Sequence, residues 1–196
     1  MGSIYKYISD FVNDINEDEV LLEIGSDRYE GSTADLAALA QLYRSHLHTV
    51  DIKADIAGRL SHQVTGPYTF HHASGETITA TWNKKIRVLY LDNFDWDWEV
   101  AVESEMISSQ KTWYRTQGLE MSNINSQISH LTQVINLTPW LTPRSIIAID
   151  DTYLHNGVFI GKGGAAVPYL ITQGFNVIKI HDNGVILGCN FAKISL

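Results

Sequence analysis

The sequence predicts an α/β fold in which helices cover both faces of a mostly parallel sheet. Three observations support it: a strand, a helix and a strand follow one another within residues 19–52, two later apolar runs end in acids, and Asn183-Gly184 joins two apolar runs near the end. The 196 residues are 44% hydrophobic and contain no linker-like stretch. We therefore expect residues 1–196 to form a single domain.

The first elements follow from the spacing of apolar residues. Apolar residues at helical spacing predict an N-terminal helix over about residues 3–16, and EVLLEI (19–24) has the length of a buried strand. A glycine-containing turn follows, and Ser32 with Asp35 resembles a pair that caps the next helix. LHTVDI (47–52) is a second strand. This order is a βαβ unit, which normally lies in a parallel sheet with a right-handed crossover.

Two further apolar runs, IRVLYLD (86–92) and SIIAIDD (145–151), also read as buried strands and also end in acids. In parallel α/β sheets, ligands bind outside the carboxyl ends of the strands. We therefore expect four carboxylates on the ligand-binding edge: Asp51, Asp92, Asp150 and Asp151.

More than fifty residues separate these two strands, which exceeds a minimal crossover. We expect a helical insertion over about residues 95–138, with helices near 97–114 and 124–135. The stretch YRTQGLEMSNINSQ between them fits a lid over the site and equally well a surface loop. After a helix near 165–173, the runs joined through Asn183-Gly184 predict a hairpin that ends the sheet with an antiparallel strand.

Composition limits the class of function. A net charge of −8 and a pI near 5.4 disfavour a protein that neutralises phosphates, so no nucleic-acid partner is expected and a small or neutral substrate fits better. Cys189 is the only cysteine, so no internal disulfide can form. With no signal or membrane-spanning pattern, we expect a soluble cytoplasmic protein without a membrane partner. A homo-oligomer remains open.

The turn in VLLEIGSDRYEGST (20–33) has the features of a ligand-binding loop. Gly25 and Gly31 supply backbone freedom where the next helix presents unpaired N–H groups. Asp51 can accept both hydroxyls of a ribose, which suggests an adenosine-containing cofactor. The dinucleotide pattern G-x-G-x-x-G does not fit, because Asp27 and Glu30 replace its later glycines. Carboxylates near the turn suit a cationic ligand with a sulfonium and an amino group.

These stretches resemble the class I S-adenosylmethionine-dependent methyltransferases. LLEIGSDRYEGST is similar to their first motif and HTVDI to their ribose-binding second motif, although Asp27 stands where the family often has glycine. VLYLDNFDWDWE, SIIAIDDTY and GKGGAAVPYLITQGF are similar to a small bacterial and phage branch. The resemblance implies a Rossmann-like seven-stranded sheet whose last strand is antiparallel. By position it implies these cofactor-binding residues: Glu23, Gly25, Ser26, Gly31, Asp51, Ser74, Gly75, Glu76 and Asp92.

The acids at the later strand ends suggest two kinds of chemistry. Asp92, Asp150 and Asp151 resemble the metal-ligand positions of catechol-type O-methyltransferases, which would suit Mg²⁺ or another divalent cation. They could equally cap the helices that follow. Without a metal, a carboxylate could act as general base, and Asp92, Asp95 and His155 are the candidate catalytic residues. Catechol-type enzymes often have lysine near the Asp95 position, so no catechol acceptor is assumed.

Two other features have both a functional and an ordinary reading. Trp96 and Trp98 could stack on a substrate, although tryptophans more commonly pack in cores and interfaces. GKGG (161–164) lacks the phosphate-loop frame, so a turn before a helix is the simpler interpretation, while Lys162 could reach an anionic acceptor.

The sequence therefore predicts an S-adenosylmethionine-dependent methyltransferase, O-directed, acting on a small-molecule or sugar-like acceptor by direct methyl displacement. A non-catalytic S-adenosylmethionine-binding or interaction protein with the same fold is the alternative. A nucleotide-dependent oxidoreductase is disfavoured because the dinucleotide glycines are missing.

Overall fold

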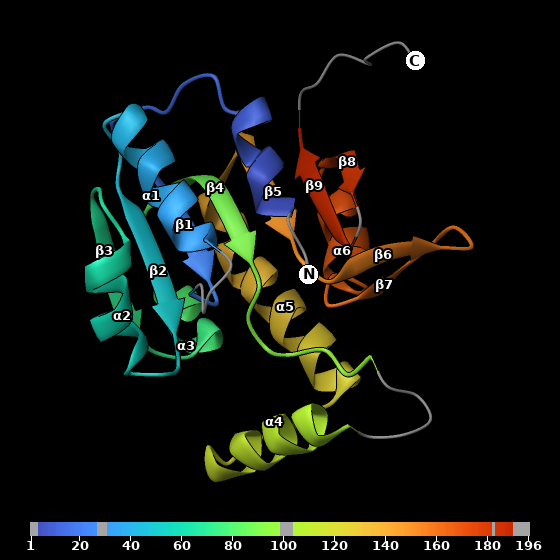
Figure 1. Cartoon of the computed structure of the whole chain (residues 1–196). Coiled ribbons are helices and arrows are strands. Elements are labelled where there is room, and N and C mark those ends of the chain that lie inside the picture. Colours follow the sequence, from blue (N-terminus) through green and yellow to red (C-terminus); the bar gives the residue numbers. More distant parts are fainter. Residues whose placement is uncertain (1–3, 27–30, 99–103, 182, 190–196) are drawn as a thin grey trace.

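The computed structural model describes residues 4–26, 31–98, 104–181 and 183–189, and its centre is one seven-stranded sheet, drawn in Figure 1. The strand order is β3-β2-β1-β4-β5-β9-β8, with β9 antiparallel to both neighbours and the other pairs parallel. The strands are β1 (Glu19–Ile24), β2 (Leu47–Asp51), β3 (Tyr68–His72), β4 (Lys85–Leu91), β5 (Leu141–Ile149), β8 (Asn176–His181) and β9 (Gly184–Gly188). The predicted seven-stranded Rossmann-like sheet with a terminal antiparallel hairpin is confirmed.

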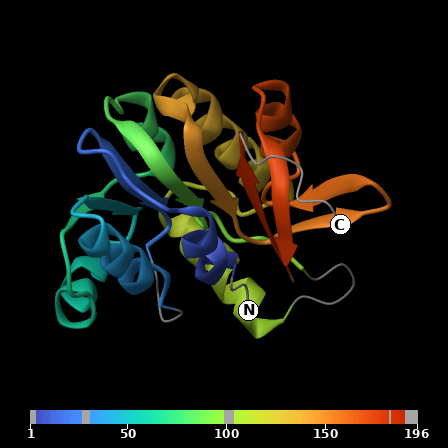
Figure 2. The same cartoon turned by 90° about the horizontal axis from the view of Figure 1, so that it is seen from above.

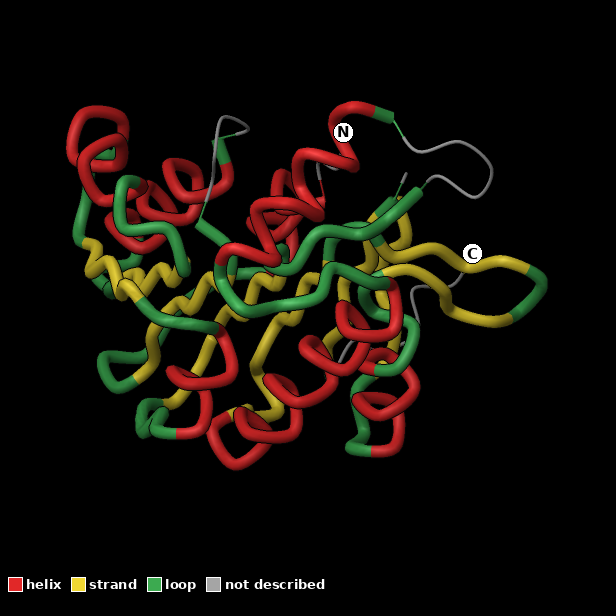
Figure 3. The backbone as a smooth tube through the Cα atoms, turned by 90° about the horizontal axis from the view of Figure 1, so that it is seen from below, coloured by secondary structure: helices red, strands yellow, loops and turns green. Residues whose placement is uncertain are grey.

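Helices cover both faces of the sheet, as Figure 3 shows from below. One face packs against η1 (Ile4–Phe11), α1 (Ser32–Leu42) and α2 (Ile56–Gln63), and the other against α3 (Gly75–Ala80), α5 (Asn123–Leu137) and α6 (Ala166–Thr172). Neighbouring strand residues such as Leu21 and Leu22 point into different cores, because side chains alternate along a strand. The central strands are therefore buried on both sides, which explains their nearly continuous apolar sequences.

The N-terminal helix is shorter than predicted and of a different type. It is a 3-10 helix over Ile4–Phe11, where the sequence predicts a helix over about 3–16. The helix ends at Phe11 because Arg87 binds the carbonyls that follow. The Arg87 Nε donates to the Asp14 carbonyl at 3.0 Å, and its Nη2 donates to the Phe11 carbonyl at 3.4 Å. Arg87 is buried beneath the segment, so these carbonyls find their partner in the sheet instead of in a longer helix.

The chain between β4 and β5 contains two helices with different positions. α5 packs against α3 and α6 and is part of the helical layer, whereas α4 (Glu105–Thr116) lies beyond the edge where the parallel strands end (Figure 1). α4 begins later than the predicted residue 97, because the Ser104 hydroxyl accepts the Ile107 N–H at 3.3 Å and so caps its start. η2 (Thr138–Trp140) then leads into β5.

A second, two-stranded sheet was not predicted. β6 (Thr152–His155) and β7 (Val158–Gly161) form an antiparallel hairpin that projects from the body of the molecule (Figures 1 and 2). Asp151 directly precedes it with a φ of 44°, a left-handed conformation that is uncommon for a residue other than glycine and turns the chain out of β5. No helix in the described part of the chain is long and apolar enough to cross a membrane.

The edge pair β2 and β3 contains a histidine cluster with a predicted effect on stability. His48 Nδ1 lies 2.9 Å from His71 Nε2, and the ring of His46 lies 5.0 Å from that of His48. Burial lowers the pKa of His48 from 6.5 to about 4, with further repulsion from His71, His46 and Lys84. The pKa of His48 is therefore lower in the folded protein than in the unfolded chain. The stability that neutral His48 contributes is complete above pH 6.5 and is lost as the pH falls toward 4.

We expect the wild type to lose about 2 kcal/mol more stability than His48→Asn/His71→Gln between about pH 7 and about pH 4.5. The asparagine and glutamine amides replace the two hydrogen-bonding nitrogens but do not titrate, so the carboxylates contribute equally to both proteins. Urea unfolding at each pH measures the difference. Parallel stability curves for the two proteins would exclude the cluster as a source of acid sensitivity.

Candidate cofactor and acceptor site

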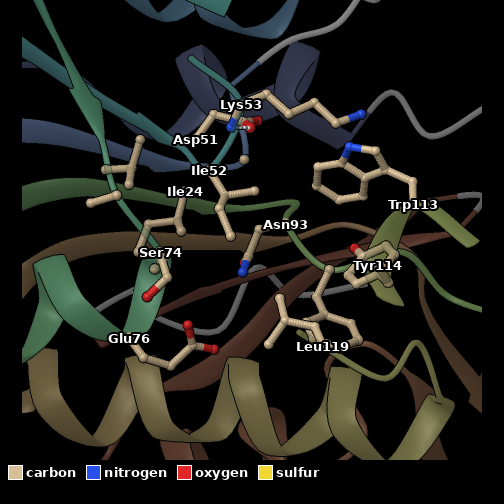
Figure 4. A pocket seen from close by; sticks show the side chains of 15 residues that line it. Ile24, Asp51, Ile52, Lys53, Ser74, Glu76, Asn93, Trp113, Tyr114 and Leu119 are labelled. Carbon is tan, nitrogen blue, oxygen red and sulfur yellow. Dashed lines mark hydrogen bonds between the residues drawn. The ribbon is translucent and has the colours of Figure 1, made fainter. Parts of the chain in front are cut away.

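A pocket opens at the edge where the parallel strands end, between the β1 turn, β2, α3 and the chain after β4 (Figure 4). The structure brings five of the predicted cofactor-binding residues to this pocket: Gly25, Asp51, Ser74, Gly75 and Glu76. Ligand sites at this edge are the rule in open parallel α/β sheets.

Gly25 is the residue that lets the β1 turn approach β4. Its φ is +93°, and a Cβ added there would lie 2.5 Å from the Asn93 nitrogen and the Asp92 carbonyl carbon. Any side chain would therefore push β1 and β4 apart. The Asp92 N–H also donates to the Ile24 carbonyl at 2.8 Å, so the two strand ends are held in register at the pocket wall.

Asp51 is the last residue of β2, and its carboxylate is oriented by the chain that follows. The Lys53 N–H donates to Asp51 Oδ1 at 2.8 Å, and Asp51 lines the pocket while being 7% exposed. Figure 4 shows it on the pocket wall opposite Ser74 and Glu76. A largely desolvated carboxylate at this place is a strong acceptor for a pair of ligand hydroxyls.

The opposite wall is the start of α3 and the segment after β4. The Ser74 hydroxyl accepts the Thr77 N–H at 3.2 Å and caps α3. The Ser129 hydroxyl donates a short hydrogen bond to Glu76 Oε1, which orients that carboxylate. Asn93 also lines the pocket, and its buried Oδ1 has no hydrogen-bond partner among the described residues. A ligand that carries an N–H or O–H donor would satisfy this oxygen.

The outer wall of the pocket comes from the predicted insertion. Trp113, Tyr114 and Leu119 line it, and the Lys53 ammonium lies 4.2 Å from the centre of the Trp113 ring. Leu119 belongs to the stretch for which the sequence left a lid and a surface loop open. The structure places this residue against the pocket, so the stretch forms part of the site.

Four predicted cofactor-binding residues do not line this pocket: Glu23, Ser26, Gly31 and Asp92, the last of which is paired with Lys162. Glu23 is fully buried behind the turn, and Ser26 is bound to Thr49 at 2.7 Å between the two hydroxyl oxygens. Gly31 is the N-cap of α1 with a φ of 99°.

The capping pair predicted for the start of α1, Ser32 with Asp35, is wrong. The Ser32 side chain makes no capping hydrogen bond and donates instead to Glu23. Asp27 and Glu30 lie outside the described residues.

The acids at the ends of β4 and β5 surround a lysine. Lys162 Nζ lies 2.7 Å from Asp92 Oδ1 and 3.0 Å from Asp151 Oδ2, and its side chain is 3% exposed. The two carboxylates hold the pKa of Lys162 above its ordinary value despite its burial. The sequence suggested that Lys162 could reach an anionic acceptor, whereas the structure pairs it with the chain's own acids.

Asp150 lies beneath this ion pair. The Tyr90 hydroxyl donates to two carboxylate oxygens, Asp150 Oδ2 at 3.2 Å and Asp92 Oδ2 at 3.3 Å. Burial raises the pKa of Asp150 to about 7, with the charges of Asp92 and Asp151 adding to the effect. Asp150 is 2% exposed, so its carboxyl group is a buried structural partner of Tyr90 and not part of the open surface.

The structure does not support the predicted divalent-metal site at Asp92, Asp150 and Asp151. Among the described residues, no group of three or more His, Cys, Asp or Glu side chains is placed to hold a metal ion. Asp92 and Asp151 face an ammonium, and Asp150 faces a phenol. This donor set does not fit a divalent cation, which prefers several oxygen ligands around it.

The two other candidate catalytic residues have different surroundings. Asp95 is half-buried in the loop after β4, and its N–H donates to the Tyr114 hydroxyl at 2.8 Å. His155 is exposed at the end of β6, where its Nε2 lies 3.1 Å from Asn156 Nδ2. His155 is the last residue of β6, in the hairpin that projects from the body (Figure 2).

The tryptophans that follow Asp95 form an aromatic wall beside the acids. The rings of Trp98 and Tyr153 pack edge to face, with their centres 4.8 Å apart. The centres of the Trp96 and Trp98 rings are 6.0 Å apart. Trp98 is 44% exposed, and Tyr153 is in β6, two residues after Asp151. The wall therefore offers an open aromatic surface next to the carboxylates.

Sequence reasoning missed several residues of this site. Asn93 directly follows Asp92 and could have been named from its position after β4. Lys53 and Trp113 come together from the loop after β2 and from α4, and no local pattern connects them. The partners of Lys162 were also hidden, because Asp92 is 70 residues away in the sequence.

No protein-family model and no curated protein matches this sequence. Solved structures do match its fold. CalS11, a TDP-rhamnose 3'-O-methyltransferase of calicheamicin biosynthesis, has a TM-score of 0.56 at 14% identity, over 94% of this chain and 76% of that one. An rRNA methylase from Streptococcus thermophilus has a TM-score of 0.51 at 13% identity, over 93% and 90%.

MycE, a methyltransferase of mycinamycin biosynthesis in complex with Mg and S-adenosylhomocysteine, has a TM-score of 0.51 at 12% identity, over 94% of this chain and 48% of that one. The chain therefore has the class I S-adenosylmethionine-dependent methyltransferase fold. Sequence identities this low show the fold alone, and the acceptors named for these proteins differ from one another.

Proposed function

We propose that this chain is an S-adenosylmethionine-dependent methyltransferase that methylates an oxygen atom of a small-molecule or sugar-like acceptor. The observation that carries the proposal is the pocket at the end of β1 and β2, where Gly25 and Asp51 face Ser74 and Glu76 in a methyltransferase fold. The same edge carries the acids and the aromatic wall, so a cofactor and an acceptor could bind side by side.

The pocket residues fit the parts of S-adenosylmethionine. Asp51 would accept the two ribose hydroxyls, and the Gly25 turn would lie along the methionine part. Asn93 Oδ1, for which the described part of the chain supplies no donor, could accept a ligand N–H, and Trp113 offers a flat surface at the outer wall. When bound, S-adenosylmethionine supplies a methyl group on a sulfonium to the acceptor oxygen.

Asp95 is the residue that we propose takes the proton from the acceptor hydroxyl. Asp92 is less suited, because its Oδ1 is paired with Lys162 and its Oδ2 with the Tyr90 hydroxyl. Asp95 lies three residues further along the chain. Its backbone N–H donates to the Tyr114 hydroxyl, and this hydrogen bond orients the loop that carries Asp95. A general base so placed typically contributes a rate factor of about 10²–10⁴.

The surroundings of the acids favour a small hydroxylated acceptor over RNA. Trp98 and Tyr153 offer ring faces and edges of the kind that pack against the apolar side of a sugar ring. Asp92, Asp95 and Asp151 at the same edge would accept hydrogen bonds from hydroxyl groups. A polyanion would meet repulsion from these acids and from the net charge of −8.

Calorimetry with S-adenosylmethionine and S-adenosylhomocysteine tests the cofactor, and S-adenosylhomocysteine formation over a panel of glycosides, nucleotide sugars, phenols and RNA tests the acceptor. We expect saturable binding of both ligands and turnover with a hydroxylated small molecule. Asp95→Asn is expected to keep S-adenosylhomocysteine affinity and to lower turnover by about 10²-fold or more.

Each other result overturns a defined part of the proposal. Absence of binding by either ligand would exclude the methyltransferase. Binding without turnover on any acceptor would favour the non-catalytic cofactor-binding protein. Turnover on RNA alone would replace the acceptor class, and full turnover by Asp95→Asn would remove Asp95 as the base.

A further inference from the structure

The ammonium of Lys162 bridges the ends of the two strands that face the proposed acceptor. Its two partners, Asp92 after β4 and Asp151 after β5, are each about one-fifth exposed, whereas the lysine side chain is 3% exposed. The positive charge thus lies behind the carboxylates, and the carboxylates lie between it and solvent. A buried lysine is retained only when such partners compensate its charge.

The backbone around Lys162 is built to hold the side chain in this place. Gly161 has a φ of +87°, and a side chain there would collide with the Asp151 carbonyl. The Lys162 N–H donates to the same carbonyl at 2.8 Å, and the Gly163 N–H donates to the Thr152 hydroxyl at 2.9 Å. Gln127 Nε2 adds a hydrogen bond to the Gly161 carbonyl at 3.1 Å. The hydrogen bonds of the GKGG segment therefore hold the backbone so that the Lys162 ammonium lies between the two carboxylates, and the segment is not a phosphate-binding loop.

A divalent cation and this ammonium would compete for the same oxygens. Mg²⁺ requires oxygens at about 2.0–2.1 Å in a near-octahedral arrangement. An ion bound to Asp92 Oδ1 and Asp151 Oδ2 would lie close to Lys162 Nζ, and the two cations would repel each other. The lysine would have to leave a buried position around which hydrogen bonds of Gly161, Lys162 and Gly163 hold the backbone.

We propose that Lys162 is the built-in cation of the acceptor side and stands where a divalent metal ion would otherwise bind between Asp92 and Asp151. It orients the two carboxylates toward the acceptor, so it is a positioning residue, because its own nitrogen is too buried to meet the acceptor. Methyl transfer by this chain is then independent of divalent metal, in contrast to what the acid positions suggest. The link to methyl transfer rests on the proposed function; the occupancy of the site by Lys162 does not.

Titration with Mn²⁺, followed by the electron paramagnetic resonance signal of the free ion, tests the occupancy directly. We expect the wild type and Asp92→Asn to bind Mn²⁺ alike and only weakly, through scattered surface acids. Lys162→Met removes the charge while keeping an unbranched side chain, and we expect it to gain one Mn²⁺ site. That site should disappear in Lys162→Met/Asp92→Asn and should not form in Lys162→Arg, which keeps the charge.

Two results would overturn the inference. One is a Mn²⁺ site in the wild type that Asp92→Asn removes, which shows that the lysine yields to a metal; this comparison decides the matter even if Lys162→Met does not fold. The other is a folded Lys162→Met, by circular dichroism, that gains no site. Calorimetry with S-adenosylhomocysteine on the same wild-type sample, in chelator, separates the two proposals: absent binding rejects the methyltransferase, while the Mn²⁺ result alone decides the role of Lys162.

Discussion

Asp51→Ala is expected to weaken S-adenosylhomocysteine binding by about 100-fold or more while leaving the protein folded. Asp51 ends β2 at the pocket and is 7% exposed, and the Lys53 N–H fixes one of its oxygens. A hydrogen bond to a charged group is worth about 1.5–3 kcal/mol, so the loss of two ribose contacts removes about 3 kcal/mol or more of binding free energy. Calorimetry on the wild type and the variant measures the change.

Asp55→Ala is the matched control for this experiment. Asp55 is an exposed carboxylate four residues further along, and its side chain makes no capping hydrogen bond to α2. It changes the net charge by the same amount without reaching the pocket, so its affinity should stay within about twofold of the wild type. Equal affinities for Asp51→Ala and the wild type would show that the ribose does not bind at Asp51, and the orientation proposed for the cofactor would fall.

The sequence predicted this pocket because of the way parallel sheets are built. β1 and β4 are buried on both faces and appear as apolar runs, β2 is a short buried strand that ends in Asp51, and the ends of all three strands lie at the same edge. Gly25 and Asp51 could therefore be placed together without knowledge of any side-chain contact. Edge elements escaped prediction, since β3 and the β6–β7 hairpin are half exposed and show no strong apolar pattern.

Residues that depend on long-range contacts could not be placed in this way. His155 is four residues from Asp151, which on a helix would mean proximity, but a strand rises about 3.3 Å per residue and carries it outward. Lys162 looked like part of a turn because its partner Asp92 belongs to another strand. Trp113 joins the pocket only through α4, whose position relative to the sheet is set by packing around Tyr114 and not by its own sequence.

Glu23→Ala is expected to destabilise the fold by about 4 kcal/mol, the largest stability effect that we predict. The Glu23 carboxylate is fully buried in β1 and accepts three hydroxyl hydrogen bonds, from Ser32 at 2.7 Å and from Thr33 and Thr49 at 2.6 Å. It therefore connects β1 to the start of α1 and to β2. Alanine would leave three buried hydroxyls without this acceptor and would also leave a cavity, and these costs add.

Urea unfolding of Glu23→Ala, Glu23→Gln and Glu17→Ala separates the contributions. Glutamine keeps the shape and one acceptor oxygen, so we expect it to lose about half as much stability as alanine. Glu17 is exposed, and its replacement should change stability by no more than about 0.5 kcal/mol. If Glu23→Ala unfolds at the same urea concentration as Glu17→Ala, the buried carboxylate is not what holds the β1 turn against α1. The position of Gly25 would then depend on its packing against β4 and on the hydrogen bond that its N–H donates to the Val50 carbonyl at 2.9 Å.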